Sequence, residues 1–501
     1  MSSPTATAPT ASEITARGLD FADWLSPILV KELRQGLKTR IFITTFILIQ
    51  VVMILLTGLQ LLQVANGAVR SSSGFSGLFA AFIWIPLIIL MPARGLTAVS
   101  EEVKVNTLDL VQLTRLTAFR IVLGKWVALI AQTLLLVTAI LPYAVLRYFF
   151  GEVDIIVDLA VIGVLLLASM VLTASALALS SAHLAVRILV VLVLLPVMVS
   201  FMVEAFDHSS AFDSNAGWLW MLPLLAGMYV FLLLEIAASR IAPISENHSG
   251  RKRLVVLLMG LVGLTLTWFA EEDVAKVWCA FCLVAACWVT LEALSERTQV
   301  IPSLYGPFAR RGFLGRVAGR VFYPGWASAV LYTAMLMGLV FAILHGLLLR
   351  HNPLEADDFL LTSRLMFPLI FTSLVTPVLV ILLFPRARQP VWLYILTQAM
   401  FGLLYVIASV AGNAPELSPE TAQRWLGPFP ASVLFVLMDD GMQSPLVTFF
   451  TTVTLPVCGL IILYLFCRAV VEFRLISKLE DQSIGKRAEP VAPVVAVTAS
   501  N

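Results

Sequence analysis

Charged residues are scarce in this chain, since Asp, Glu, Lys and Arg make up only 13% of its 501 residues. Soluble domains carry about 25% charged residues, so this composition excludes an ordinary water-soluble protein. Hydrophobic residues make up 59%, and the mean hydropathy is +0.94. We therefore expect a polytopic membrane protein of the all-α class. A net charge of +2 gives no reason to expect a nucleic-acid partner.

Residues and motifs for metal, redox or nucleotide chemistry are also few. Cys279 and Cys282 form one C-x-x-C pair, but no second Cys or His pair accompanies it. We interpret both cysteines as packing residues rather than metal ligands. The five histidines are scattered, and no G-x-x-x-x-G-K-[ST], H-E-x-x-H or G-x-S-x-G motif occurs. The chain is therefore expected to be no enzyme and to hold no cofactor of its own.

Long apolar runs make up most of the sequence. A helix needs about 20 apolar residues to cross a bilayer. Twelve runs meet this requirement, at residues 41–63, 76–96, 122–147, 155–180, 186–204, 217–238, 254–270, 274–294, 326–349, 360–384, 391–411 and 444–467. The segments 1–22 and 479–501 lack such runs, and we expect both to be disordered tails.

The distribution of basic residues predicts the orientation of these spans. With the N-terminus in the cytoplasm, 27 of the 33 Lys and Arg residues fall on the cytoplasmic side and 6 on the other. Cytoplasmic loops of membrane proteins carry such an excess. Twelve spans with both termini cytoplasmic are therefore predicted.

The segment 26–40, ahead of the first span, has the pattern of an amphipathic helix. Ser26 and Pro27 suit its first positions. Leucines recur every four residues on one face and basic residues on another: Leu25, Leu29, Leu33 and Leu37, against Lys31, Arg34 and Lys38. The pattern indicates a helix in the cytoplasmic interface. An ordinary basic flank of the first span is the alternative.

Two similar segments suggest an internal duplication. LTAVSEEVKV (96–105) and LEALSERTQV (291–300) match at five of ten positions, at an offset of 195. Each follows an even-numbered span on the predicted cytoplasmic side. The chain is therefore a candidate for two six-span halves, 23–240 and 241–478, as in many transporters. A chance match is the alternative.

Acidic residues in the spans are rare. Glu235 and Glu292 lie near the predicted cytoplasmic ends of their spans, where interfacial water or Arg240 and Arg297 are in reach. We expect structural roles for both. Acids that could relay protons are missing deeper in the membrane, which weakens the hypothesis of a gradient-driven carrier. An intramembrane enzyme is weakened too, because no cluster of reactive residues shares one depth.

The charged segment 97–121 is the most distinctive interruption of the apolar runs. Asn106 and Thr107 can cap a helix, and Asp109 in its first turn suits the helix dipole. Apolar side chains stand between the charges: Leu108, Val111, Leu116 and Phe119. Such a helix can dock in a groove of a soluble partner. A solvated loop is the alternative.

These residues resemble the signature of permeases of the type-2 (exporter) family of ABC transporters. The similarity covers roughly residues 24–150: the amphipathic SPILVKELRQGLKTR, two acids after the second span, Asn-Thr-Leu-Asp-Leu from Asn106, and Ile-Val-Leu-Gly-Lys from Ile121. Arg115 stands where the family usually has Pro, and the last 260 or so residues carry no family signature. One chain could therefore supply a full pore, or two chains could pair.

The resemblance implies that this chain is the membrane subunit of an ATP-driven exporter. A separate P-loop ATPase would bind ATP and Mg²⁺ and grip the coupling segment. The residues implied at that contact are Glu101, Glu102, Thr107, Asp109, Arg115 and Lys125. The bacterial inner membrane is the expected location. A polytopic scaffold or sensor that binds the ATPase without transporting is the alternative function.

A second basic segment follows the eighth span. Glu296, Arg310, Arg311, Arg316 and Arg320 lie in the longest cytoplasmic loop of the second half. They could form a second coupling contact or bind anionic membrane lipids. No pattern in the sequence indicates the substrate.

Overall fold

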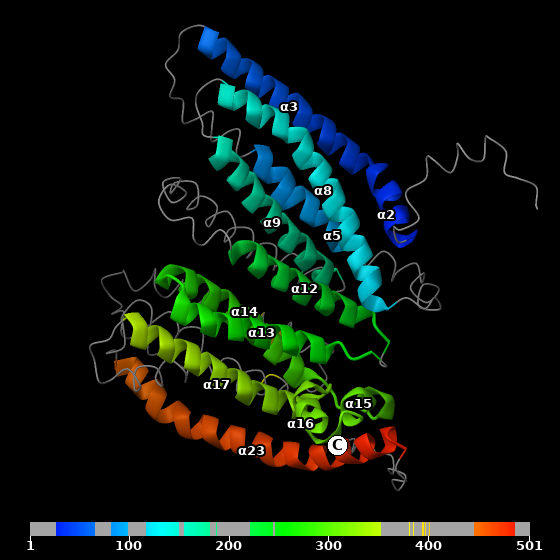
Figure 1. The fold of residues 1–501 in the computed structure, drawn as a ribbon, viewed down its shortest axis with the longest axis vertical. Helices are drawn as coiled ribbons and strands as arrows, with labels where there is room; N and C mark the ends of the chain where they lie inside the picture. The colour runs from blue at the N-terminus through cyan, green and yellow to red at the C-terminus, as the bar shows by residue number, and fades with distance from the viewer. Residues whose placement is uncertain are drawn as a thin grey trace, which may run out of the picture. The chain divides into compact units, whose positions relative to one another are not determined.

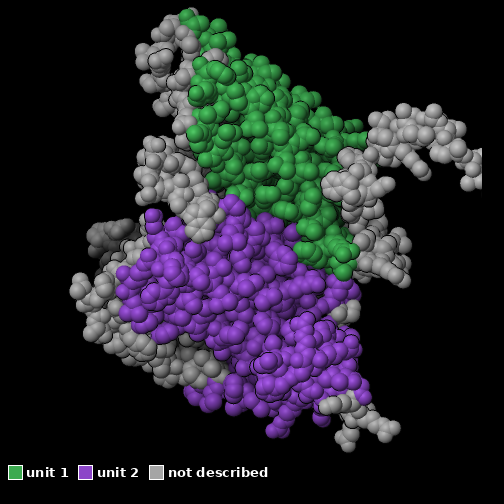
Figure 2. All heavy atoms as spheres, in the orientation of Figure 1, with its two compact units in different colours: residues 1–214 green, residues 215–501 purple. Residues whose placement is uncertain are grey.

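A computed structural model describes residues 27–65, 82–98, 117–149, 155–180, 221–243, 246–351 and 445–485, with single positions at 187, 380, 384, 393, 394, 396 and 400. The chain divides into two compact units, residues 1–214 and 215–501 (Figure 2). Regular structure in the described residues is helical throughout, which confirms the all-α class.

Seven helices in the described part of the chain are long and apolar enough to cross a membrane: Arg40–Leu62, Ala118–Leu146, Asp158–Leu179, Met221–Ile241, Ser249–Phe269, Val274–Ser295 and Trp326–Leu347. They correspond to seven of the twelve predicted spans. The predicted span 76–96 is represented by a shorter apolar helix, Phe82–Leu96. The span predicted at 444–467 lies in a helix that runs from Pro445 to Ser483. The spans predicted at 186–204, 360–384 and 391–411 fall almost entirely outside the described residues, so the total of twelve stays a prediction.

The first unit is a layered set of helices (Figure 1). Its elements are α2 (Pro27–Leu37), α3 (Arg40–Ala65), η1 (Ile85–Leu90), α5 (Met91–Ala98), α8 (Ala118–Phe149) and α9 (Ile155–Leu179). Both α2 and α3 pack on α8, which packs on α9, and α5 packs on α9. Their shared core contains Met53, Leu87, Leu136 and Leu165, each at most 1% exposed.

A proline explains the unusual turn η1, a π-helix. Pro86 has no backbone N–H, so it breaks the regular i→i−4 hydrogen-bond ladder. The N–H of Met91 donates to the carbonyl of Pro86, five residues earlier, which is the spacing of a π-helix. The chain then continues as α5 without a loop. In α8, Pro142 lies inside a helix that the structure assigns as continuous.

The second unit contains α12 (Met221–Ile241), α13 (Ser249–Phe269), α14 (Glu272–Ser295), α15 (Pro302–Ala309), α16 (Gly312–Phe322), α17 (Trp326–His351) and α23 (Pro445–Ser483). The α13, α14 and α17 helices pack against one another, and α12 packs on α13. Figure 1 shows the short helices α15 and α16 beside the C-terminal part of α23. The α12 helix belongs to the second compact unit and packs on α13 and α14, whereas the division into two six-span halves at residue 240 stays a prediction.

Small residues allow α13, α14 and α17 to approach closely. A Cβ on Gly263 would lie 3.1 Å from the ring of Trp278, and one on Gly260 would lie 2.4 Å from Leu339. The indole of Trp278 is fully buried and donates to the carbonyl of Met259 at 2.9 Å. Glycine at such contacts is the usual device of membrane helix packing. Cys279 and Cys282 are buried free thiols in α14, a position that suits packing residues.

Successive spans of the second unit run antiparallel, so their ends gather at two levels. One level holds the C-terminal ends of α12 and α14 and the N-terminal ends of α13 and α17. Hydrogen bonds join these ends: Glu235 to His248, and Arg253 to both Glu296 and Gly325. Here α15, α16 and the last turns of α23 also lie. This is the end that the positive-inside rule predicts to be cytoplasmic.

Candidate functional site

Lys125 is the one implied coupling residue of the first unit that the structure describes. Glu101, Glu102, Thr107, Asp109 and Arg115 lie outside the described residues. Lys125 is 5% exposed, and its Nζ donates to Oε1 of Glu32 at 3.1 Å. This ion pair joins the beginning of α8 to α2, so the charge of Lys125 is directed into the unit.

A second cross-link holds the same end of the first unit. Arg94, in the middle of α5, donates to the side-chain oxygen of Gln132 in α8. Its other guanidinium nitrogen donates to the carbonyl of Gly36 at 3.4 Å and to Oγ1 of Thr39 at 3.3 Å. Its cationic carbon also lies 5.8 Å from the ring centre of Phe42. One arginine therefore connects α5, α8 and the junction of α2 with α3.

Gly36 makes the crossing of α2 and α8 possible. A Cβ at this position would lie 2.1 Å from Nε2 of Gln132, well inside van der Waals contact. Gln132 is only 2% exposed and is held by Arg94, so it has little room to move. The helix pair thus depends on the absence of a side chain at residue 36.

The coupling segment 97–121 begins in α5 and ends in α8. The cross-links described above attach both of these helices to α2. We refer to Glu32, Gly36, Arg94, Lys125 and Gln132 as the clasp. The clasp gives a mechanical connection from both arms of the coupling segment to the amphipathic helix that precedes the first span.

The second unit carries a buried layer of charges where its spans end. Glu235 of α12 is fully buried, and its Oε2 lies 2.6 Å from Nδ1 of His248. Nη1 of Arg251 donates to the other oxygen of Glu235 at 3.1 Å. The second ring nitrogen of His248 lies 3.0 Å from Glu246. Glu235 therefore meets two partners from the start of α13 and has no access to interfacial water.

Lys252 and Glu292 form the centre of this layer. Lys252 is 3% exposed, and its Nζ lies 2.8 Å from Oε1 of Glu292 in α14. Arg240 reaches the same oxygen at 4.0 Å. The expected neighbour Arg240 is thus confirmed for Glu292, but the closest cation is Lys252, which we did not predict.

Arg253 is only 1% exposed, and its guanidinium joins four segments of the chain. Its Nη1 donates to the carbonyls of Val321 at 2.9 Å and Tyr323 at 2.8 Å, where α16 ends. Its Nη2 donates to Glu296 at 3.0 Å and to the carbonyl of Gly325 at 3.3 Å. The terminal carbonyls of a helix have no partners within the helix, so a cation is well placed there.

Glu296 completes the layer at the end of α14. Besides Arg253, it accepts a hydrogen bond from the hydroxyl of Ser249 in the first turn of α13. The backbone N–H of Gly325 also donates to it, at 3.4 Å. Glu296 is thus committed to contacts within the unit.

The four predicted arginines of the second basic segment separate into two kinds. Arg316 donates to Asp481 at 3.1 Å and Arg320 to Ser477 at 3.1 Å, so both fasten α16 to α23. Arg310 and Arg311 have exposed side chains, and neither forms an ion pair with the described residues. Only these two present their charge outward.

Tyrosines and a buried carboxyl fill the contact of α15 with α23. The rings of Tyr305 and Tyr323 meet edge to face at 4.7 Å, and the hydroxyl of Tyr323 donates to the carbonyl of Tyr305 at 3.2 Å. Burial, together with Glu472 and Glu480, raises the pKa of Tyr305 to about 12. Burial also raises the pKa of Glu480, and this effect outweighs those of Tyr323, Arg320 and Arg316, which lower it.

Sequence reasoning missed the buried layer because it treated each charge separately. Arg251, Lys252 and Arg253 were interpreted only as markers of orientation. Three consecutive residues at the start of a helix point about 100° apart. They can therefore meet different acids on the two neighbouring helices α12 and α14, and the acids near the ends of the sixth and eighth spans were the available signal.

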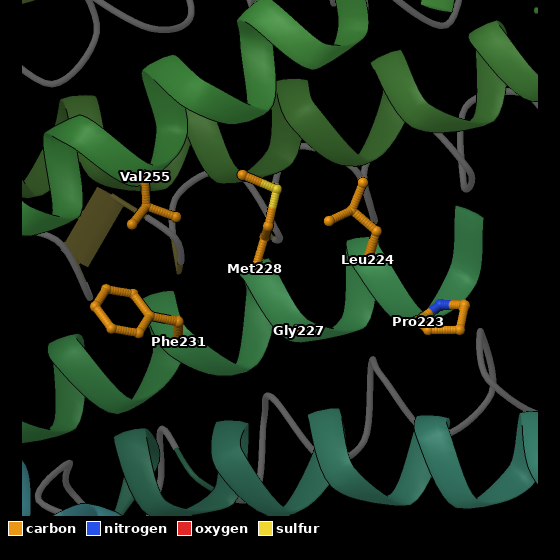
Figure 3. A pocket seen from close by; sticks show the side chains of 6 residues that line it. All are labelled: Pro223, Leu224, Gly227, Met228, Phe231 and Val255. Carbon is orange, nitrogen blue, oxygen red and sulfur yellow. The ribbon is translucent and has the colours of Figure 1, made fainter. Parts of the chain in front are cut away.

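No described group of three or more His, Cys, Asp or Glu side chains is arranged to hold a metal ion. A shallow apolar groove lies on α12 and α13, lined by Pro223, Leu224, Gly227, Met228, Phe231 and Val255 (Figure 3). Ligand sites usually contain a few polar groups that orient the ligand. The groove has no such side chain, so it does not indicate a site for a polar substrate.

Comparisons with known proteins give no match: no family model, no curated protein and no solved structure is significantly similar to this chain. The sequence pattern and the geometry described above are therefore the grounds for a function.

Proposed function

We propose that this chain is the membrane subunit of an ATP-driven exporter, coupled to a separate P-loop ATPase through residues 97–121. The observation that supports this proposal is the clasp, in which α2, α5 and α8 are cross-linked by Glu32–Lys125 and by Arg94. The clasp joins two of the stretches that carry the resemblance to type-2 permeases, the amphipathic segment and Ile-Val-Leu-Gly-Lys.

The clasp suits the transmission of force. A partner that moved the coupling segment would move the ends of α5 and α8, to which the segment is attached. The two cross-links would carry that movement to α2, and α3 follows α2 after a two-residue break. A displacement of helices as a packed group is a common form of conformational switching.

Hydrolysis is assigned to the partner. The chain contains no motif that cradles nucleotide phosphates. ATP and Mg²⁺ would therefore be bound by the ATPase subunit. Export as the direction, the bacterial inner membrane as the location and a pairing with a second permease chain rest on the family resemblance alone.

Co-purification tests the partner. The full chain is isolated gently from its native membrane, as wild type and as Asp109→Lys/Arg115→Glu, and the bound proteins are identified. We expect a P-loop ATPase with the wild type and its loss from the variant. A matched control, Arg316→Glu/Asp481→Lys, changes the same number of charges but preserves an ion pair of the second unit. An ATPase absent from the wild type, in a preparation that keeps other complexes intact, would contradict the proposal.

A second experiment separates a transporter from a scaffold. Lys125→Met breaks the clasp without changing residues 97–116, so the ATPase should stay bound. We expect its ATP hydrolysis in lipid nanodiscs to lose its dependence on the membrane subunit, and the exchange Glu32→Lys/Lys125→Glu to restore part of it. Hydrolysis that is identical with and without the membrane subunit, in wild type, would favour the scaffold.

A further inference from the structure

The helix α16 carries an apolar face that points away from the protein. Phe313 and Leu314 are each 79% exposed, and Val317 is 51% exposed. At about 100° per residue these three side chains fall within roughly 100° of arc on one side of the helix. Gly315 and Gly319 occupy the opposite, buried side. The usual arrangement of a surface helix, apolar side inward, is therefore reversed.

The contacts of α16 fix this orientation. A Cβ on Gly315 would lie 2.3 Å from the carbonyl oxygen of Phe308, and one on Gly319 would lie 2.4 Å from the ring of Tyr323. Arg316 and Arg320 bond to α23 from the sides of the helix. A rotation that buried Phe313 and Leu314 would break all these contacts, so the apolar face is held outward.

The position of α16 places this face near the level where membrane spans begin. Carbonyls at its C-terminal end, those of Val321 and Tyr323, accept hydrogen bonds from Arg253 near the start of α13, and α17 starts at Trp326, four residues after α16 ends. Both α13 and α17 are candidate spans. Trp326 lies under the guanidinium of Arg468 at 5.7 Å, and Trp is typical of the membrane–water boundary.

Two exposed arginines adjoin the apolar face. Arg310 and Arg311 form the turn that leads into α16. Arginines beside an apolar face are typical of helices that lie in a membrane interface, where guanidinium groups meet lipid phosphates. A soluble partner could also cover apolar residues, but the attachment of α16 to the ends of two spans favours lipid.

We propose that α16 lies in the membrane interface and binds anionic phospholipid, with Phe313, Leu314 and Val317 at the acyl boundary and Arg310 and Arg311 on the phosphates. The proposal does not depend on the proposed transport function. It predicts that the bilayer itself completes the fold of this end of the second unit.

Photo-crosslinking identifies what covers the face. A benzophenone amino acid replaces Leu314 in the full chain, in native membranes, and the products are analysed by mass spectrometry. We expect phospholipid adducts, as for the same replacement at Leu258, an exposed residue of the α13 span. The replacement at Lys478, exposed on the last part of α23, should give none. Adducts to a protein instead of lipid at Leu314, or no adduct while Leu258 reacts, would overturn the proposal.

Native mass spectrometry measures the charge contribution. Phosphatidylglycerol is titrated onto detergent-purified protein, with phosphatidylcholine as the uncharged comparison. Arg310→Gln/Arg311→Gln should weaken phosphatidylglycerol binding about fivefold per arginine. Arg474→Gln/Lys478→Gln removes two exposed charges from α23 and should leave it unchanged. A lipid site at α16 would be refuted if both double variants lost phosphatidylglycerol affinity equally, or if Arg310→Gln/Arg311→Gln lost none.

Discussion

The buried pair of Lys252 and Glu292 allows a quantitative test of the charge layer. At the observed 2.8 Å, Coulomb's law with an effective dielectric constant of 20 gives an attraction of about 6 kcal/mol before desolvation. Much of this is offset because both ions leave water. Removing one ion from a buried pair costs about 3–5 kcal/mol, since the other ion then stays buried and unpaired.

The remaining neighbours of Lys252 and Glu292 should make the two single variants lose different amounts of stability. Lys252→Met leaves Glu292 with Arg240 at 4.0 Å, a partner that is 24% exposed. Glu292→Gln leaves Lys252 with Glu296 at 4.0 Å, and a glutamine oxygen can still accept its hydrogen bond. We therefore expect Lys252→Met to cost about 3–5 kcal/mol and Glu292→Gln distinctly less.

A double-mutant cycle measures the interaction of the pair. Unfolding free energies are obtained by reversible SDS titration in mixed micelles for the wild type, Lys252→Met, Glu292→Leu and the double variant. The double variant should lie within about 1–2 kcal/mol of the wild type, because no buried charge is left unpaired. Lys478→Met, at an exposed position, controls for the loss of a lysine and should change little. Additive effects of the two single changes would refute the argument.

Three further predictions concern packing, backbone conformation and protonation. Gly36→Ala should destabilise the first unit by about 1–3 kcal/mol in the same SDS titration, since its Cβ would overlap Gln132. The control is Gly58→Ala, whose Cβ would meet nothing within 4 Å and which should be neutral or stabilising. Gly325→Ala should cost at least about 1–2 kcal/mol, because Gly325 has φ of +123° and a Cβ there would lie 3.0 Å from Cα of Thr298; an unchanged unfolding curve would contradict this. Burial raises the pKa of Glu480 above its ordinary value of 4.5, so the folded state binds the proton more tightly and its stability should fall as pH rises above 4.5. Glu480→Gln should remove that part of the pH dependence of the unfolding free energy, measured from pH 4 upward, and a slope identical to wild type would reject the assignment.

Hydropathy predicted the long apolar helices in the described part of the chain, because an apolar run of about 20 residues has few alternatives in a bilayer, but it did not predict the short helices α15 and α16. The ends of α13 and α17 follow the predicted spans to within a few residues. Hydropathy could not predict that α12 groups with the second unit. It measures how well each helix suits a lipid environment and carries no information on which helices pack together.

The candidate sites were predictable to different degrees. Lys125 was singled out by its place in a motif, yet its partner Glu32 lies 93 residues away in the chain, a distance that no local pattern covers. Arg253 looked like one positive charge among several. Its role depends on where α16 ends, and that end is fixed by glycine packing that hydropathy does not register.

The charge layer of the second unit also bears on how the chain enters the membrane during synthesis. Glu235 finds both of its partners, His248 and Arg251, within the next 16 residues, so the α12–α13 hairpin neutralises its own acid. When α14 follows, Lys252 already stands at the level where Glu292 arrives. Arg253 completes its hydrogen bonds only when residues as late as Gly325 have been synthesised. The acids are thus matched in the order in which a ribosome delivers them, so that Glu235 and Glu292 each have a cation nearby in sequence or already in place, which limits the cost of an unpaired acid in the lipid.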